Sequence, residues 1–175
     1  GGAGDNAAAA CGIGAIRPGE GFVSLGTSGV LFVSNERFSP NTAGAVHAFC
    51  HAIPDTWHQM GVILSATDSL NWLSRVTGQD PAGLAASAEA GFAGPGETMF
   101  LPYLSGERTP HNNAGARGSF VGLSQSTEVG HLAQAVMEGV AFAFRDCQRV
   151  LADAGTRTNR LLAVGGGSKS DLWLR

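Results

Sequence analysis

Alternating apolar positions predict four strands in the first third of the chain. Two β-rich runs, Phe22–Leu25 and Val30–Val33, flank a Gly-Thr-Ser-Gly turn, which predicts a hairpin whose tip, Gly26–Gly29, carries little side-chain bulk. Val46–Ile53 alternates between the two faces of a strand, and Trp57–Leu64 returns after a turn. Because these consecutive runs are joined by short connections, we expect an antiparallel meander.

Helical spacing predicts four helices between and after these strands. Asp5 or Asn6 would cap a first helix that begins with a run of alanines. The second covers about 66–76 and ends at Gly78, and the third covers 81–90. The longest begins after a Ser126 or Thr127 cap and runs to about residue 154, with apolar residues three or four positions apart.

Three shorter strands complete the expected elements, at 99–101, 119–123 and 161–164. The last is apolar throughout, which indicates a buried strand, and it runs into the glycine loop Gly165–Ser168, where a new helix should begin. Between the first two, Ser105–Gly118 is polar and rich in turn residues. We expect it to be a surface loop over a cleft, since loops often carry sites.

Composition narrows the class of protein. With 43% hydrophobic and 14% charged residues among 175, the chain is expected to be globular. Its 26 glycines cluster at turns, which indicates tight loops around a ligand. A net charge of −3 without a basic stripe argues against nucleic acid, and no apolar run reaches membrane-spanning length. Three scattered cysteines, Cys11, Cys50 and Cys147, predict buried free thiols in a reducing compartment, hence a cytoplasmic protein.

The hairpin tip is the first candidate site. Gly26 and Gly29 allow positive φ and a close approach to the backbone, and exposed N–H groups in such a turn suit an anion. The hydroxyls of Thr27 and Ser28 add donors, so the tip is a candidate phosphate cradle. An ordinary tight hairpin is the alternative, because glycine-rich turns are common.

A second candidate is the strand, glycine loop and helix at Val164–Ser170, an arrangement in which free N–H groups can receive a nucleotide. The Walker A motif is absent, because Ser168 instead of glycine precedes Lys169. Lys169 is therefore interpreted as a solvated side chain. Gly2–Ala7 matches a dinucleotide-binding pattern, but no strand precedes it in this chain.

Asp5 lies on a glycine-rich turn and is the best candidate for acid–base chemistry, with helix capping as the alternative role. A metal site is not expected, although His47, Cys50, His51 and His58 are potential ligands. On a strand, His47 and His51 would lie roughly 13 Å apart. That separation is too large for two ligands of one zinc ion.

Several motifs, in this order, resemble the C-terminal half of an FGGY carbohydrate kinase. Three of them are glycine-rich and include the two candidate sites and Asp5: Gly4–Ala8, Ser24–Gly29 and Gly165–Ser170. Gly118–Leu123 followed by 131–138 is similar to the second signature of that family. The segments 46–52, 57–60 and 101–110 look like the branch of the family that acts on D-xylulose. The resemblance covers essentially the whole chain.

The resemblance implies an α/β fold of the actin-like, ribonuclease-H-like type, in which a mixed sheet opens with an antiparallel meander and carries helices on both faces. Residues 1–175 would then be an incomplete C-terminal nucleotide-binding domain, and the N-terminal sugar-binding domain would be absent. The implied reaction is ATP-dependent phosphorylation of a ketopentose, D-xylulose, with Mg²⁺. A homodimer is the candidate assembly, and the isolated piece is expected to be inactive.

The resemblance also assigns roles to residues. Asp5 would contact the sugar and act as the general base, and Gly26 and Thr27 would contact the phosphates of ATP. The remaining assignments are contacts to the nucleotide, made by Thr67, Asn71, Gly166, Gly167 and Asp171. Two alternatives stay open: a kinase of glycerol, ribulose or another sugar, and a non-catalytic actin-like module that binds nucleotide without turnover.

Overall fold

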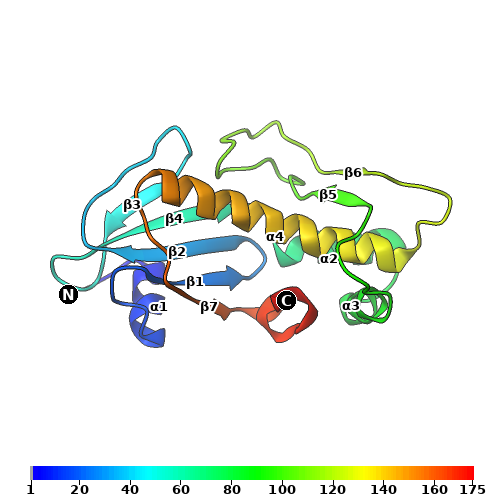
Figure 1. Ribbon diagram of the computed structural model, residues 1–175, viewed down its shortest axis with the longest axis horizontal. Coiled ribbons are helices and arrows are strands. Elements are labelled where there is room, and N and C mark those ends of the chain that lie inside the picture. The colour runs from blue at the N-terminus through cyan, green and yellow to red at the C-terminus, as the bar shows by residue number, and fades with distance from the viewer. Residues whose placement is uncertain (1) are drawn as a thin grey trace.

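A mixed five-stranded sheet forms the centre of the molecule (Figure 1). In the computed structural model, which describes residues 2–175, the strand order is β3-β4-β2-β1-β7. The strands β1 (Glu20–Leu25), β2 (Gly29–Asn35), β4 (Trp57–Ile63) and β3 (His47–Cys50) pair antiparallel with one another in the order β1-β2-β4-β3. On its other side, β1 pairs in parallel with β7 (Arg160–Val164).

The predicted hairpin is confirmed, but the predicted meander has the wrong strand order. β1 and β2 pair with Leu25 opposite Gly29, and β2 then pairs with β4, which leaves β3 at the edge of the sheet. The long connection 36–46 lets the chain pass the position that β4 later fills. In the inner place residues 58–61 of β4 are buried, whereas β3 at the edge is partly exposed.

The expectation of a buried last strand is also wrong. β7 forms the second edge of the sheet, and Leu161 is 37% exposed. The helix expected after the glycine loop is replaced by two short 3₁₀ turns, η1 (Gly166–Lys169) and η2 (Leu172–Leu174). Apolar character alone therefore did not distinguish a central strand from an edge strand.

Helices cover both faces of the sheet, as expected (Figure 1). Strand residues alternate between the faces, so Phe32 packs toward α1 (Asp5–Ile13) while Val33 packs toward α4 (Val129–Asp153). Small alanines let α1 lie close to the sheet. On the other face, the apolar stripe of α4, including Phe144, completes the main hydrophobic cluster.

A second cluster forms where the N-terminal half of α4 extends beyond the sheet. It contains α2 (Thr67–Thr77), α3 (Pro81–Ala90) and the two-stranded sheet of β5 (Met99–Leu101) and β6 (Ser119–Val121). Both predicted helices are confirmed, and Gly78 ends α2 in the left-handed conformation. None of the helices in residues 2–175 has both the length and the apolar character of a membrane span.

Two predicted helix caps are wrong. At α4 the cap is Glu128, whose carboxylate accepts from the backbone N–H of His131 while the His131 ring accepts from Glu128 N; Ser126 and Thr127 lie outside this capping box. At α1 the N-cap is Gly4, with no side-chain cap, and Asp5 is the first helical residue. The side chain of Asp5 is therefore not occupied by capping.

Buried histidines make the fold sensitive to acid. The ring of His58 stacks on Phe32 at 4.6 Å and lies 5.8 Å from Phe49. Burial, followed by the nearby His51, lowers the pKa of His58 from 6.5 to about 4. The fold therefore favours the neutral ring, and this stabilisation is complete above pH 6.5 and is lost as the pH falls toward 4.

We expect His58→Phe to remove part of this acid sensitivity. In the unmodified protein, His58 should lower the free energy of unfolding by up to roughly 3 kcal/mol between pH 7 and pH 4. A phenyl ring keeps the stacking and cannot be protonated, so the variant should lose less stability over the same range. Urea denaturation at both pH values measures this, with the exposed His111→Phe as control. An equal acid-induced loss in His58→Phe would contradict the expectation.

Candidate functional site

A cavity of about 580 Å³ lies between α2, α3 and the C-terminal turns. Five of the predicted site residues line it: Thr67, Asn71, Gly166, Gly167 and Asp171. They come from two parts of the chain that are far apart in sequence, the start of α2 and the glycine loop after β7. The fold thus brings these candidates to one place, while the role of each stays a prediction.

The cavity also has walls that sequence reasoning missed. Trp173 of η2, Leu70 of α2 and Pro81 of α3 line it, and the indole N–H of Trp173 donates to the carbonyl of Met137 at 2.9 Å. Lys169, interpreted as a solvated side chain, is exposed but stands at the rim. An apolar slot with a few polar groups is typical of a small-molecule site. Nothing in the amphipathic patterns of these elements links them to a ligand.

The hairpin tip is held against the start of α2. The carbonyl of Gly26 accepts from the backbone N–H of Thr67 at 2.9 Å and from its hydroxyl at 2.8 Å. The carbonyl of Thr27 accepts from the N–H groups of Ala66, at 2.9 Å, and Asp68, at 3.3 Å. The tip therefore replaces a side-chain cap at α2 and adjoins the cavity through Thr67.

The donors of the tip remain available because its carbonyls point to α2. Within residues 2–175, the backbone N–H groups of Gly26, Thr27 and Ser28 donate to no acceptor, and neither do the hydroxyls of Thr27 and Ser28. Both side chains are exposed. Unpaired backbone donors beside a helix N-terminus suit an anion such as a phosphate group.

The glycines of the tip are needed for a different reason from the one predicted. Neither Gly26 nor Gly29 has a positive φ. A Cβ at Gly29 would lie 2.4 Å from the ring of Phe144 and 2.6 Å from Ile63 Cγ1, so packing against α4 requires the glycine. Positive φ occurs instead at Gly165, at 92°, where a Cβ would lie 2.8 Å from the carbonyl oxygen of Leu25.

The two glycines that follow Gly165 differ in their surroundings. A Cβ at Gly167 would lie 2.8 Å from the Cβ of Leu25 and 3.1 Å from Thr67 Cγ2, so this glycine packs the loop against β1 and α2. A Cβ at Gly166 would meet no atom within 4 Å, and Gly166 lines the cavity. Gly167 thus serves the packing of the loop, and Gly166 leaves room for a ligand.

Asp5 lies outside this cavity. It is exposed in the first turn of α1, where its Oδ1 accepts from the backbone N–H of Asn6 at 2.8 Å and from the Asn6 side chain at 3.2 Å. Its Oδ2 has no hydrogen-bond partner in the described part of the chain. The carboxylate is therefore free to accept a proton from a bound molecule.

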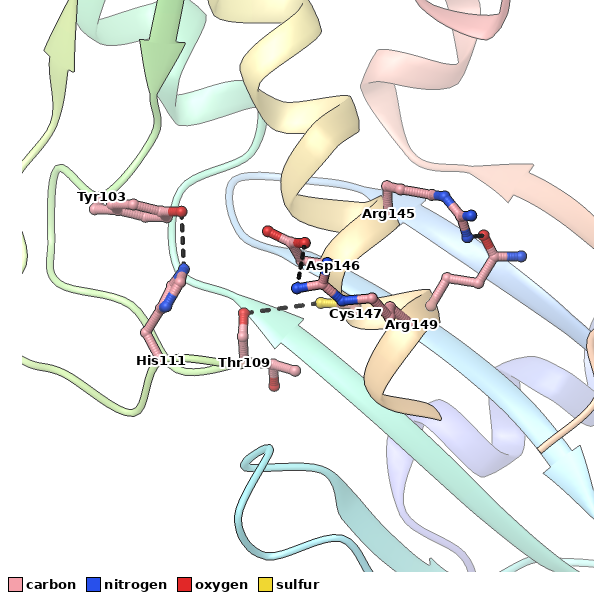
Figure 2. A network of polar contacts seen from close by, with 8 residues as sticks. Tyr103, Thr109, His111, Arg145, Asp146, Cys147 and Arg149 are labelled. Atoms are coloured by element: carbon pink, nitrogen blue, oxygen red, sulfur yellow. Dashed lines mark hydrogen bonds and ion pairs between the residues drawn. The ribbon is translucent and has the colours of Figure 1, made fainter. Parts of the chain in front are cut away.

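The polar loop after β5 packs on α4 and on the side of β4 (Figure 2). Figure 2 shows the side chain of Tyr103 directed at His111 and the side chain of Cys147 on α4 directed at Thr109. The Tyr103 hydroxyl lies 2.9 Å from His111 Nε2, and the Cys147 thiol donates to the carbonyl of Thr109 at 3.9 Å. Thr109 also pairs with β4, because its N–H donates to Val62 O at 3.0 Å and its hydroxyl accepts from Val62 N at 3.0 Å.

A buried carboxylate, missed in the sequence, anchors this loop. Glu107 is only 2% exposed, and its Oε1 accepts from the N–H groups of Leu64, at 3.0 Å, and Arg108, at 2.7 Å. Burial raises the pKa of Glu107, and the two N–H bonds oppose the rise. Burial, then Glu107 and Asp146, raises the pKa of Cys147 to about 12, so this thiol is not a nucleophile at neutral pH.

The histidines do not assemble a metal centre. His51 and His58 lie edge to face, with ring centroids 5.8 Å apart in the interior. Residues 2–175 contain no group of three or more His, Cys, Asp or Glu side chains placed to hold a metal ion. The cysteines are also separate: Cys147 is buried as expected, but the expectation of buried thiols is wrong for Cys11 and Cys50, which are exposed.

Comparison with known proteins identifies the family. Residues 21–175 match the C-terminal domain of the FGGY family of carbohydrate kinases. The chain belongs to this family. The expected fold class, an actin-like and ribonuclease-H-like α/β domain, is confirmed by its structural neighbours.

Named relatives of this FGGY chain include several xylulose kinases. It is 45% identical to the xylulose kinase of Escherichia coli (strain K12) over 174 residues, which cover 98% of this chain and 36% of that protein. The crystal structure of a xyloylose kinase from Brucella ovis is 57% identical, with a TM-score of 0.97 over 99% of this chain and 36% of the other. A gluconate kinase from Lactobacillus acidophilus is 28% identical, with a TM-score of 0.82 over 93% and 33%. The chain thus spans about a third of the length of its relatives.

Proposed function

We propose that residues 1–175 form most of the C-terminal nucleotide-binding domain of a longer two-domain kinase that phosphorylates D-xylulose with ATP. One observation carries the proposal: a hairpin tip with unpaired donors is hydrogen-bonded to the start of α2, and the start of α2 lines one cavity together with the glycine loop. The choice of D-xylulose rests on the similarity to xylulose kinases.

The geometry supports a nucleotide whose base binds in the cavity and whose phosphates bind at the hairpin tip. The slot beside Trp173 and Gly166 offers apolar walls and open space for a planar base. Thr67, Asn71 and Asp171 supply polar groups at the same cavity. The donors of Gly26–Ser28 lie next to Thr67 and would receive phosphate oxygens.

Asp5 would serve as the general base. A sugar hydroxyl is a poor nucleophile at neutral pH, so a carboxylate that accepts its proton in the transition state contributes roughly 10² to 10⁴ in rate. The Oδ2 of Asp5 is available for that proton. Mg²⁺ bound with ATP would neutralise phosphate charge, and no residue of this chain is assigned as its ligand.

The proposal is tested by ADP release from the full-length enzyme with a panel of D-xylulose, D-ribulose, glycerol and gluconate. We expect D-xylulose to give the highest kcat/KM. A higher kcat/KM for another substrate would leave the kinase assignment standing and change the assigned substrate. Gluconate is included in the panel because the chain is similar to a gluconate kinase. ATP binding without sugar-dependent ADP release would favour the non-catalytic module instead.

We also expect the isolated 175-residue chain to show no D-xylulose-dependent ADP release. In a two-domain kinase, closure of the two domains positions the reactants and excludes water, and this chain would supply only one side of that cleft. A coupled assay with the isolated chain and with the full-length enzyme at equal concentration measures the difference. Turnover by the isolated chain would show that the proposed second domain is dispensable.

A further inference from the structure

A second cavity, of about 350 Å³, lies at the other end of β1 from the hairpin tip. Its walls come from three connections: residues 18–19 before β1, 36–39 after β2, and 155–159 between α4 and β7. In Figure 1 this is the end of the sheet at which α4 finishes. The two cavities share no lining residue, and the kinase assignment does not use this one.

The floor of this cavity is a buried polar network. Asn35 and Thr156, which line the cavity, are 9% and 6% exposed, and Gln59 beneath them is 1% exposed. The Gln59 amide nitrogen donates to the carbonyl of Ser39, so its Oε1 is the acceptor for the Thr156 hydroxyl. Asn35 Nδ2 donates to the same Oε1 at 3.2 Å and to Thr156 Oγ1 at 3.0 Å. These donors fix the orientation of both amides.

This orientation leaves one acceptor of Asn35 at the cavity without a protein partner. Asn35 Oδ1 accepts no hydrogen bond from any residue in the range 2–175. It is not among the fully buried atoms, so it is open to the cavity that Asn35 lines. A hydroxyl group of a bound molecule can donate to such an amide oxygen.

Positive charge lies at the rim of the same cavity. Arg37 and Arg157 line it, and neither side chain forms an ion pair or hydrogen bond within the described residues. With Glu36, the charged lining residues sum to +1, whereas the whole chain carries −3. Gly155 makes room for Arg37, because a Cβ there would lie 3.3 Å from Arg37 Nη2. Guanidinium groups bind phosphate oxygens in a bidentate geometry.

We propose that this cavity binds a small phosphate monoester that carries hydroxyl groups, such as a sugar phosphate. Arg37 and Arg157 hold the phosphate, and Asn35 Oδ1 accepts from a hydroxyl of the same molecule. The volume falls at the lower end of the range for small-molecule pockets, roughly 300 to 1,000 Å³. The site stands on residues that the proposed kinase function does not use.

Isothermal titration of the full-length protein with ribose 5-phosphate, inorganic phosphate and ribose tests the proposal. We expect ribose 5-phosphate to bind more tightly than inorganic phosphate and ribose to give no saturable heat at this site. The double variant Arg37→Gln/Arg157→Gln should weaken ribose 5-phosphate about 100-fold, at about tenfold for each guanidinium. Both side chains are exposed, so the variant should fold, which its melting temperature checks.

The matched control is Arg145→Gln/Arg160→Gln, which makes the same change in charge at exposed arginines outside the cavity. It should bind ribose 5-phosphate as the unmodified protein does. Equal affinity in the Arg37→Gln/Arg157→Gln variant, or equal weakening in the control, would overturn the site. Inorganic phosphate binding as tightly as ribose 5-phosphate would overturn the role of Asn35 Oδ1. The titration measures binding and not turnover, so failure of the ADP-release assays would contradict the kinase proposal without affecting the proposed phosphate site.

Discussion

Asp5→Asn in the full-length enzyme is expected to lower turnover by roughly 10² or more. The side-chain amide keeps the size of the carboxylate and can still accept a hydrogen bond from Asn6. It cannot take the proton of a sugar hydroxyl. Because Gly4 is the N-cap of α1, the change removes no cap, and its effect on unfolding should stay within about 1 kcal/mol.

Asp80→Asn is the matched control for this variant. Asp80 caps α3 by accepting from the N–H of Gly83 at 2.9 Å, and asparagine is an equally good cap. We expect it to keep both turnover and stability. Steady-state kinetics with D-xylulose and a denaturation curve for each variant separate catalysis from folding. Near-normal turnover in a folded Asp5→Asn enzyme would remove Asp5 from the role of base.

Local patterns predicted the elements better than their arrangement. The third helix, 81–90, has the bounds that its proline and alanines predict, and Gly78 ends α2 as expected. The order of strands was not predictable in the same way, because strand pairing depends on contacts between distant segments. β4 lies inside the sheet and is the more buried strand, while β3 lies at the edge, and the period of alternation in the two segments does not encode this order.

The candidate site shows the same division between local and distant information. The glycines of the hairpin tip were found from the sequence, but Gly29 is required by Phe144, which belongs to α4, and not by its backbone conformation. Trp173 and Pro81 carry no local signal that places them at one cavity with Asn71. Only the packing of α2, α3 and the C-terminal turns brings these side chains together.

Buried polar residues were the least predictable part. Glu107 lies in a polar, turn-rich segment whose composition indicates solvent exposure, yet it is almost fully buried. β3 pairs only with residues 57–60 of β4, so the N–H of Leu64, just after β4, has no strand partner on that side. Glu107 anchors the loop because its carboxylate accepts from this N–H. Asn35 and Gln59 likewise occupy strand positions, and the sequence pattern does not predict the hydrogen bond that their side chains form with each other.

Gly166→Leu is expected to raise the KM for ATP at least about tenfold and leave the free energy of unfolding nearly unchanged. A Cβ at Gly166 would meet no atom within 4 Å, and its φ lies outside the left-handed region, so the fold can accept a side chain there. The added isobutyl group would occupy the cavity that Trp173 and Asn71 also line. Nucleotide and side chain would then compete for the same space.

Gly12→Leu is the control, because Gly12 is exposed on α1, lies outside the cavity and also has open space at its Cβ. Leucine favours a helix over glycine, so this variant should be at least as stable and keep its KM for ATP. An unchanged KM for ATP in a folded Gly166→Leu enzyme would place the nucleotide elsewhere. A rise in the KM for D-xylulose alone would assign the cavity to the sugar, since the same obstruction would then act on the other substrate.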